Sequence, residues 1–361
     1  MKVGLQNLTK VFPSRNKKSK EEVIAVNDLT FEIPDGKLVG LLGPSGCGKS
    51  TTLYMISGLQ KPTSGRIFFG EDDVTNVSTE HRGIGLVFQN YALYPHMTVK
   101  QNILFPLQNL KGSEKLSKEK MLEKAYYVAK LVQLEELMER KPSELSGGQQ
   151  QRVAIARALV KMPKVLLLDE PLSNLDARLR LQTREEIRKI QKETGITTIF
   201  VTHDQEEAMS ISDEIVVMKT GVEQQKGKPQ FVYDQPVNQF VAKFLGTPPI
   251  NIFYGKIENK GLYIGDEKIE DIDLPDQEVT IGIRPEGFEV CEDGCFTVQA
   301  KQVEHIGRDK SIVAVHPSTE KDSFRLIIES DIEVEENSTI KLNVKPTKCF
   351  VFDKLTEARL K

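Results

Sequence analysis

The 361-residue sequence has no tryptophan, only four cysteines and no long hydrophobic run. No apolar stretch approaches the roughly 18 residues of a membrane-spanning helix, and the polar start at residues 1–6 lacks a signal-peptide core. The cysteines have no paired metal-site spacing, which favours free thiols in a reducing compartment over zinc or disulfides. A net charge of −3 argues against a general nucleic-acid binder. We therefore expect a cytoplasmic protein whose membrane role, if any, comes through partners.

The residues that are present predict an α/β fold followed by a β-rich module. Apolar runs at 38–42, 84–88, 165–168, 197–201 and 214–218 are separated by helical patterns, as in a mostly parallel sheet, and the run at 214–218 is expected to be its last strand. Beyond residues 245–249 the runs become short, alternating and separated by Gly, Pro, Asn and Asp, which predicts an all-β module closed into a small barrel. Two domains are expected, 1–244 and 245–361.

One motif between an apolar run and a helical pattern predicts a bound polyphosphate. Its glycines let backbone N–H groups turn toward a phosphate, and the following helix adds the positive end of its dipole. Lys49 is expected to reach the β- and γ-phosphates, and Ser50 to ligate Mg²⁺. On its own the motif is compatible with kinases, GTPases and motors. It consists of Gly43, Pro44, Ser45, Gly46, Cys47, Gly48, Lys49, Ser50 and Thr51.

Two carboxylates, Asp169 and Glu170, follow the apolar run at 165–168. An all-apolar run is typical of a central parallel strand, which delivers the residues after it to the carboxyl edge of the sheet. Asp169 fits a carboxylate that holds Mg²⁺ through water, and Glu170 is placed to act as general base on an attacking water. Alone, the pair is equally compatible with an ordinary strand end. Together with the phosphate loop it indicates nucleotide hydrolysis.

A second anion cradle is predicted at Ser146, Gly147, Gly148 and Gln149, where a serine and two glycines precede a helical pattern. A single phosphate does not need two cradles from one chain. We infer that this loop serves a nucleotide held mainly by another copy. The alternative is a helix N-cap with a flexible glycine pair.

Together these residues resemble the nucleotide-binding subunit of an ATP-binding cassette (ABC) transporter, and residues 145–159 resemble that family's signature and the helix after it. The resemblance implies a RecA-like core with a helical subdomain at about 90–160, followed by an OB-like regulatory domain at 245–361. It also implies ATP and Mg²⁺. The assembly would be a head-to-tail homodimer with two ATP molecules at its interface, each between one phosphate loop and the other copy's signature.

The resemblance adds further roles and supports those already assigned to Ser50, Asp169 and Glu170. Phe12 resembles the aromatic residue that stacks on adenine, and Asp176, which closes Ser173-Asn-Leu-Asp176, resembles a residue of the loop that crosses the dimer. The implied catalytic residues are Glu170, His203 and Gln89, and the implied metal ligands are Ser50, Gln89 and Asp169. A groove for the permease is implied at Phe88, Tyr91, Leu93, Tyr94 and Pro95, for which the alternative is the core of the helical subdomain. Residues 13–22 predict a solvated hairpin loop that is longer than usual.

The stretches 89–96, 240–246 and 282–286 resemble the carbohydrate-uptake ATPases of maltose, multiple-sugar and glycerol-3-phosphate importers. This implies a peripheral protein on the cytoplasmic face of the cell membrane. It would energise sugar uptake through two permease subunits and, indirectly, an extracytoplasmic solute-binding protein, without nucleic acid. The alternatives are a soluble cassette ATPase acting on the ribosome or nucleic acid, and an importer ATPase for a non-sugar solute. The first is disfavoured because the chain has one compact cassette and no coiled coil.

Overall fold

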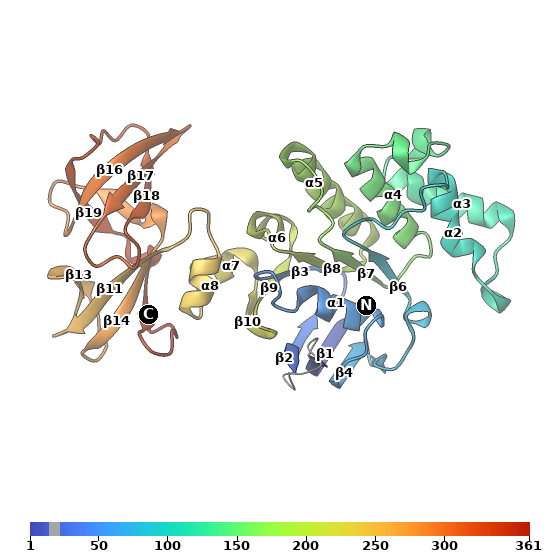
Figure 1. Cartoon of the computed structure of the whole chain (residues 1–361), viewed down its shortest axis with the longest axis horizontal. Coiled ribbons are helices and arrows are strands. Elements are labelled where there is room, and N and C mark those ends of the chain that lie inside the picture. Colours follow the sequence, from blue (N-terminus) through green and yellow to red (C-terminus); the bar gives the residue numbers. More distant parts are fainter. Residues whose placement is uncertain (14–21) are drawn as a thin grey trace. The chain divides into compact units, whose positions relative to one another are not determined.

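The computed structural model describes residues 1–13 and 22–361, so most of the predicted hairpin loop lies outside the described residues (Figure 1). The chain divides into two compact units, Met1–Pro229 and Gln230–Lys361. The division precedes helix α8 (Gln239–Phe244), which the sequence-based boundary at 244 places in the first domain. Buried Arg284 explains why α8 groups with the second unit, since its guanidinium donates to the carbonyls of Ala242 and Leu245 at the end of this helix.

The first unit contains a six-stranded sheet with strand order β10-β9-β3-β8-β7-β6. The five strands from β9 to β6 are parallel, which confirms the predicted α/β class. β10 pairs antiparallel with β9 and was not predicted, because its sequence Val-Glu-Gln-Gln-Lys-Gly has a single apolar residue. The strands are β3 (Leu38–Leu42), β6 (Ile84–Val87), β7 (Val165–Asp169), β8 (Thr197–Thr202), β9 (Glu214–Lys219) and β10 (Val222–Gly227).

A second, antiparallel sheet in this unit has the order β2-β1-β4-β5. Helix α1 (Lys49–Ser57) shares one apolar core with both sheets, into which it buries Leu53, Met55 and Ile56. This packing fixes the helix that follows the phosphate loop against the rest of the unit. The strands are β1 (Val3–Phe12), β2 (Val23–Ile33), β4 (Ser64–Phe69) and β5 (Asp72–Asp73).

A helical layer packs on the six-stranded sheet, in a core that contains Leu166 and Phe200 of the strands together with apolar residues of five helices. Tyr91 is only 6% exposed and belongs to this core, so for this residue the alternative to a permease groove holds. No helix among the described residues is long and apolar enough to cross a membrane. The helices are α2 (Val99–Gln108), α3 (Lys118–Leu131), α4 (Gly147–Leu159), α5 (Ala177–Thr194) and α6 (Gln205–Ile211).

The second unit begins within α7 (Pro229–Asp234), includes α8 and continues with two five-stranded antiparallel sheets, β13-β12-β11-β14-β20 and β15-β19-β16-β17-β18. The predicted β-rich module is confirmed, but it forms two open sheets with a common core around Phe253 and Phe296 rather than one small closed barrel. The strands are β11 (Asn251–Glu258), β12 (Gly261–Ile264), β13 (Glu267–Asp271), β14 (Gln277–Ile283), β15 (Phe288–Val290), β16 (Phe296–Ile306), β17 (Asp309–Val315), β18 (Phe324–Glu329), β19 (Thr339–Val344) and β20 (Cys349–Asp353).

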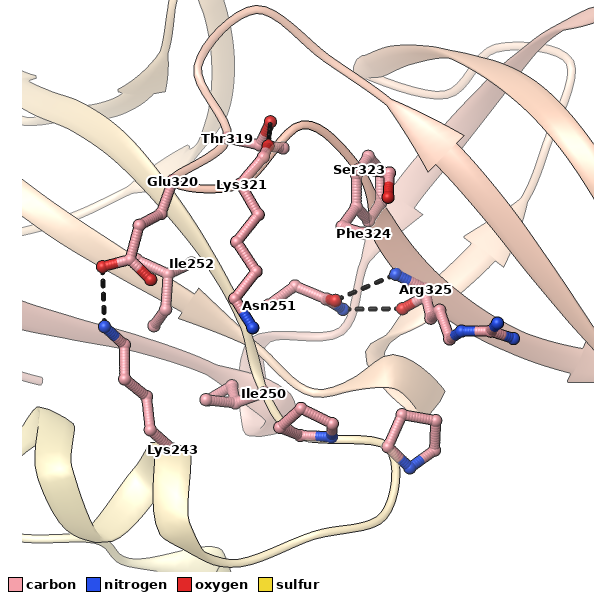
Figure 2. Close-up of a pocket in the computed structure, with 12 residues that line it drawn as sticks. Lys243, Ile250, Asn251, Ile252, Thr319, Glu320, Lys321, Ser323, Phe324 and Arg325 are labelled. Atoms are coloured by element: carbon pink, nitrogen blue, oxygen red, sulfur yellow. Dashed lines mark hydrogen bonds and ion pairs between the residues drawn. The ribbon is translucent and has the colours of Figure 1, made fainter.

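Figure 2 shows how the two sheets of this unit are joined beside a hollow of about 490 Å³. The side-chain amide of Asn251 in β11 donates to the backbone carbonyl of Arg325 in β18 at 2.7 Å, and the Arg325 N–H donates back to the Asn251 Oδ1 at 3.0 Å. Across the hollow, Lys243 of α8 pairs with Glu320 at 2.7 Å. The side-chain amide of Asn251 therefore makes the two hydrogen bonds to Arg325 that the backbone of a neighbouring strand would make, and so links the two sheets.

Candidate functional site

The phosphate loop connects the end of β3 to the start of α1, and its glycines differ in what they permit. A Cβ on Gly43 would lie 2.4 Å from the Met218 carbonyl, and one on Gly48 would lie 2.4 Å from the Ala25 carbonyl. Gly46 and Gly48 have φ angles of 80° and 100°. A Cβ on Gly46 would meet nothing within 4 Å. Two glycines are therefore required by packing, while Gly46 borders open space at the loop.

Lys49 is only 5% exposed, and its ammonium lies within the phosphate loop. It donates to the carbonyls of Gly43 at 2.8 Å and Pro44 at 3.0 Å. Cys47 is buried beside it, and this burial raises the pKa of the thiol. Of the remaining loop residues, Pro44, Ser45 and Gly46 are exposed and Thr51 is half-buried in the first turn of α1. The ammonium also donates to the Cys47 Sγ at 3.8 Å, so its partners are two carbonyls and a thiol and include no anion. Such an ammonium, within a cradle open at Gly46, fits a polyphosphate ligand.

Asp169, which ends β7, is 4% exposed and accepts two hydrogen bonds from α1. The Ser50 hydroxyl donates to its Oδ1 at 2.8 Å, and the Tyr54 hydroxyl donates to its Oδ2 at 2.7 Å. Burial, and then the bond to Asp169, raises the pKa of Tyr54 to about 12. Sequence reasoning missed Tyr54, although its i,i+4 spacing from Ser50 places both on one face of the helix.

The donor set around Asp169 fits Mg²⁺ only in part. A hydroxyl and a carboxylate are hard oxygen ligands of the kind that Mg²⁺ prefers. No group of three His, Cys, Asp or Glu side chains that could hold a metal occurs anywhere in the described part of the chain. Mg²⁺ at Ser50 and Asp169 would therefore take its other ligands from phosphate oxygens and water, as is common for this ion.

The three predicted catalytic residues lie together, because Gln89 and His203 both contact one carboxylate oxygen of Glu170. The Gln89 amide donates to Glu170 Oε2 at 3.4 Å, and His203 Nδ1 lies 3.2 Å from the same atom. Glu170 has a φ of 44°, an uncommon backbone conformation for a side chain other than glycine, and its N–H donates to the Val201 carbonyl at 3.0 Å. The Gln89 amide also donates to the Ser173 hydroxyl at 3.2 Å. Residues far apart in the sequence thus meet at the carboxyl edge of the sheet.

Three other predicted groups belong to other elements than the phosphate loop. Phe12 pairs with Val23 at the end of β1, with the Lys10 ammonium 5.1 Å from its ring centroid. Ser146 begins α4 in a capping box, where the Gln149 N–H donates to the Ser146 hydroxyl at 3.3 Å and the Ser146 N–H donates to Gln149 Oε1 at 2.9 Å. This is the N-cap considered as the alternative.

Asp176 begins α5 in the same way, since its Oδ1 accepts from the Leu179 N–H at 3.0 Å. Gly147 and Gly148 allow the start of α4 to pack closely against Leu175 and Leu179. A Cβ on Gly147 would lie 3.0 Å from Leu175, and one on Gly148 would lie 2.9 Å from Leu179. Within residues 1–13 and 22–361, no hydrogen bond joins Ser146, Gln149 or Asp176 to the phosphate loop. These groups are held in position, but not around their own chain's loop.

Known proteins resemble the whole chain. Residues 26–173 match the family model described as ABC transporter. The chain is 43% identical to the trehalose/maltose import ATP-binding protein MalK of Thermococcus litoralis, over 93% of this chain and 95% of that protein. It is 39% identical to the diacetylchitobiose uptake system ATP-binding protein MsiK of Streptomyces coelicolor, over 99% of both. To the sn-glycerol-3-phosphate import ATP-binding protein UgpC of Psychromonas ingrahamii it is 44% identical, over 84% of this chain and 80% of that protein.

The fold also matches a solved structure, a dimeric ATP-binding cassette in a post-hydrolysis state bound to ADP and Pi. The TM-score is 0.55 at 34% identity, and the match covers 63% of this chain and 98% of that one. The extent of this match agrees with a cassette that is followed by a further β-rich unit. The import ATP-binding proteins MalK and MsiK are 43% and 39% identical to this chain over more than nine tenths of each protein. The chain therefore belongs to the ABC transporter family.

Proposed function

We propose that the protein is the ATP-hydrolysing subunit of an ABC importer, bound peripherally at the cytoplasmic face of the cell membrane. It energises the uptake of a sugar or a glycerol-3-phosphate-like solute through two partner permeases, to which an extracytoplasmic binding protein delivers the solute. The observation that carries the ATPase activity is the meeting of Gln89 and His203 on one oxygen of Glu170 beside the phosphate loop. The import relatives support the choice of solute.

In the proposed reaction the phosphate loop binds ATP through its backbone N–H groups, and Lys49 exchanges the carbonyls of Gly43 and Pro44 for phosphate oxygens. Ser50 and Asp169 would hold Mg²⁺, which would neutralise charge on the phosphates. Glu170 accepts the proton of the attacking water. The amide of Gln89 and the imidazole of His203 hold the Glu170 carboxylate toward the nucleotide.

The proposed active assembly is a head-to-tail homodimer. Ser146, Gly147, Gly148, Gln149 and Asp176 lie on preformed helix starts away from their own phosphate loop, which supports a role at the nucleotide of the partner subunit. Phe12 is proposed to stack on adenine. Residues 1–244 are proposed as the nucleotide-binding domain and 245–361 as the regulatory domain.

Two experiments test this proposal. Purified wild-type protein should hydrolyse ATP in the presence of Mg²⁺, and Glu170→Gln should bind ATP but turn over at least about 100-fold more slowly, as expected when a general base is lost. Wild-type turnover by the Glu170→Gln variant would contradict the assigned base. Tagged full-length protein should also co-purify with membrane permeases. Stable association with ribosomes instead would favour the alternative cassette ATPase.

A further inference from the structure

Arg180 on α5 contacts two segments that each begin at a catalytic residue. Its Nη2 donates to the Leu175 carbonyl at 3.1 Å, in the segment that follows Glu170. Its Nη1 lies 3.6 Å from Asp204 Oδ2, and its Nε lies 3.6 Å from Glu207 Oε1. Asp204 and Glu207 belong to the segment that follows His203. One side chain therefore joins the chain after the proposed base to the chain after the histidine that contacts it.

Glu207 is a buried carboxylate, 4% exposed, that the surrounding residues hold in one place. Its Oε2 accepts from the Thr202 hydroxyl at 2.6 Å, and the same hydroxyl oxygen accepts from the Asp204 N–H at 3.0 Å. Thr202 and Asp204 are the two neighbours of His203. Burial of a carboxylate is costly unless it is paired, and Arg180 is its cationic partner here. The loop that carries His203 is thus fixed on both sides of the histidine.

This network borders the catalytic carboxylate directly. A crevice of about 40 Å³ is lined by Glu170, Ser173, Arg180, His203 and Glu207, among other polar residues. The volume exceeds the roughly 10–15 Å³ that one water needs. A change at Arg180 or Glu207 therefore alters the wall of the space in which Glu170 and His203 meet.

We infer that Arg180, with Glu207, is a positioning residue for ATP hydrolysis, which sets the His203 loop relative to the segment after Glu170. The inference rests on the proposed ATPase function. Leu175 links this network to the signature as well, because its side chain lies where a Cβ on Gly147 would come within 3.0 Å. Displacement of residues 173–176 is transmitted to His203 through the guanidinium of Arg180. Arg180 itself acts through other residues and does not contact the reacting atoms.

The test compares full-length Arg180→Gln, Glu207→Gln and the double variant with wild type. The matched control is Lys189→Gln, on the same helix, where an exposed lysine pairs with Glu193 at 3.8 Å. Each single variant should lower kcat for ATP about 10-fold and leave KM and ATP affinity close to wild type, because misplacement of a catalytic group mainly affects turnover. Arg180→Gln should also lower the melting temperature, because it leaves the buried Glu207 carboxylate without its cationic partner, so kcat is measured well below the unfolding transition. Arg180→Lys keeps the positive charge but cannot contact Leu175, Asp204 and Glu207 at the same time, so its kcat should lie between those of wild type and Arg180→Gln.

The double variant separates one network from two independent effects. If Arg180 and Glu207 act as a unit, the double variant loses about 10-fold in kcat, whereas independent effects would multiply to about 100-fold. The inference is overturned by a multiplied loss, by Arg180→Gln turnover within twofold of the Lys189→Gln control, or by a fall in ATP affinity that parallels kcat. Failure of the ATPase proposal is distinguishable, since wild type would then show no turnover sensitive to Glu170→Gln.

Discussion

Two alanine substitutions in the phosphate loop should differ in their cost to stability, although both replace a glycine at positive φ. Gly46→Ala has open space for its methyl group, so only the left-handed backbone costs energy, about 1–2 kcal/mol. Gly48→Ala carries a similar backbone cost and also places its Cβ 2.4 Å from the Ala25 carbonyl. Overpacking against a backbone atom in a core costs about 1–3 kcal/mol more. The expected total for Gly48→Ala is about 2–5 kcal/mol.

Differential scanning calorimetry of the full chain without nucleotide tests this difference. At about 2–4 °C per kcal/mol for a unit of this size, the Gly48→Ala transition of the first unit should lie at least about 2 °C below that of Gly46→Ala. Gly46→Ala serves as the matched control for backbone strain. Equal transition temperatures for the two variants would refute the argument that contact with β2, rather than φ alone, requires glycine at 48.

Three further substitutions test contacts that hold the site in place. Arg82→Met should destabilise by about 3 kcal/mol or more in urea unfolding, because this buried guanidinium donates to four carbonyls, including those of Met55 and Ile56 in α1; a cost below 1 kcal/mol would contradict this. Burial opposes the ionisation of Asp213, but hydrogen bonds from Arg188 and the Leu38 N–H outweigh it and lower its pKa. Asp213→Ala should therefore cost about 2–3 kcal/mol at neutral pH, and the difference should shrink as the pH falls below 3.8, through the lowered folded-state pKa; a difference that is constant with pH would contradict it. Tyr54→Phe should lower the free energy of unfolding by about 1 kcal/mol below pH 10, because the hydroxyl bond to Asp169 is lost. The difference in unfolding free energy between wild type and variant should vanish as the pH rises toward 12, where wild-type Tyr54 ionises. An ultraviolet titration without a tyrosine pKa near 12 would count against the bond to Asp169.

Much of the first unit could be predicted because its signals are local. The phosphate loop, the apolar β7 and the carboxylates after it follow from short patterns, and the parallel sheet then brings Glu170 and His203 to one edge. Strands with few apolar residues could not be found this way: β10 has one, and β5 consists of Asp72 and Asp73 alone. Their pairing comes from the neighbouring strand.

The contacts around the site were less predictable than its members. Tyr54 and Arg180 contact the site because their side chains extend from a helix to residues of other elements. The spacing of Tyr54 from Ser50 shows that they share a helix face, but the sequence does not show that this face meets Asp169. The positive φ of Glu170 likewise depends on the bond from its N–H to Val201 in the neighbouring strand. In the second unit the alternating runs predicted strands correctly, but not that the strands form two sheets, because pairing partners lie far apart in the sequence.

The central claim is that one chain supplies the phosphate loop and its partner supplies the signature. The most direct measurement is the molar mass in solution of the Glu170→Gln variant, by light scattering, with and without MgATP. The claim predicts a monomer that becomes a dimer with ATP and not with ADP. It also predicts that adding Ser146→Arg abolishes the dimer while the chain still binds ATP. A variant that stays monomeric with bound ATP, or a dimer that tolerates Ser146→Arg, would contradict the claim.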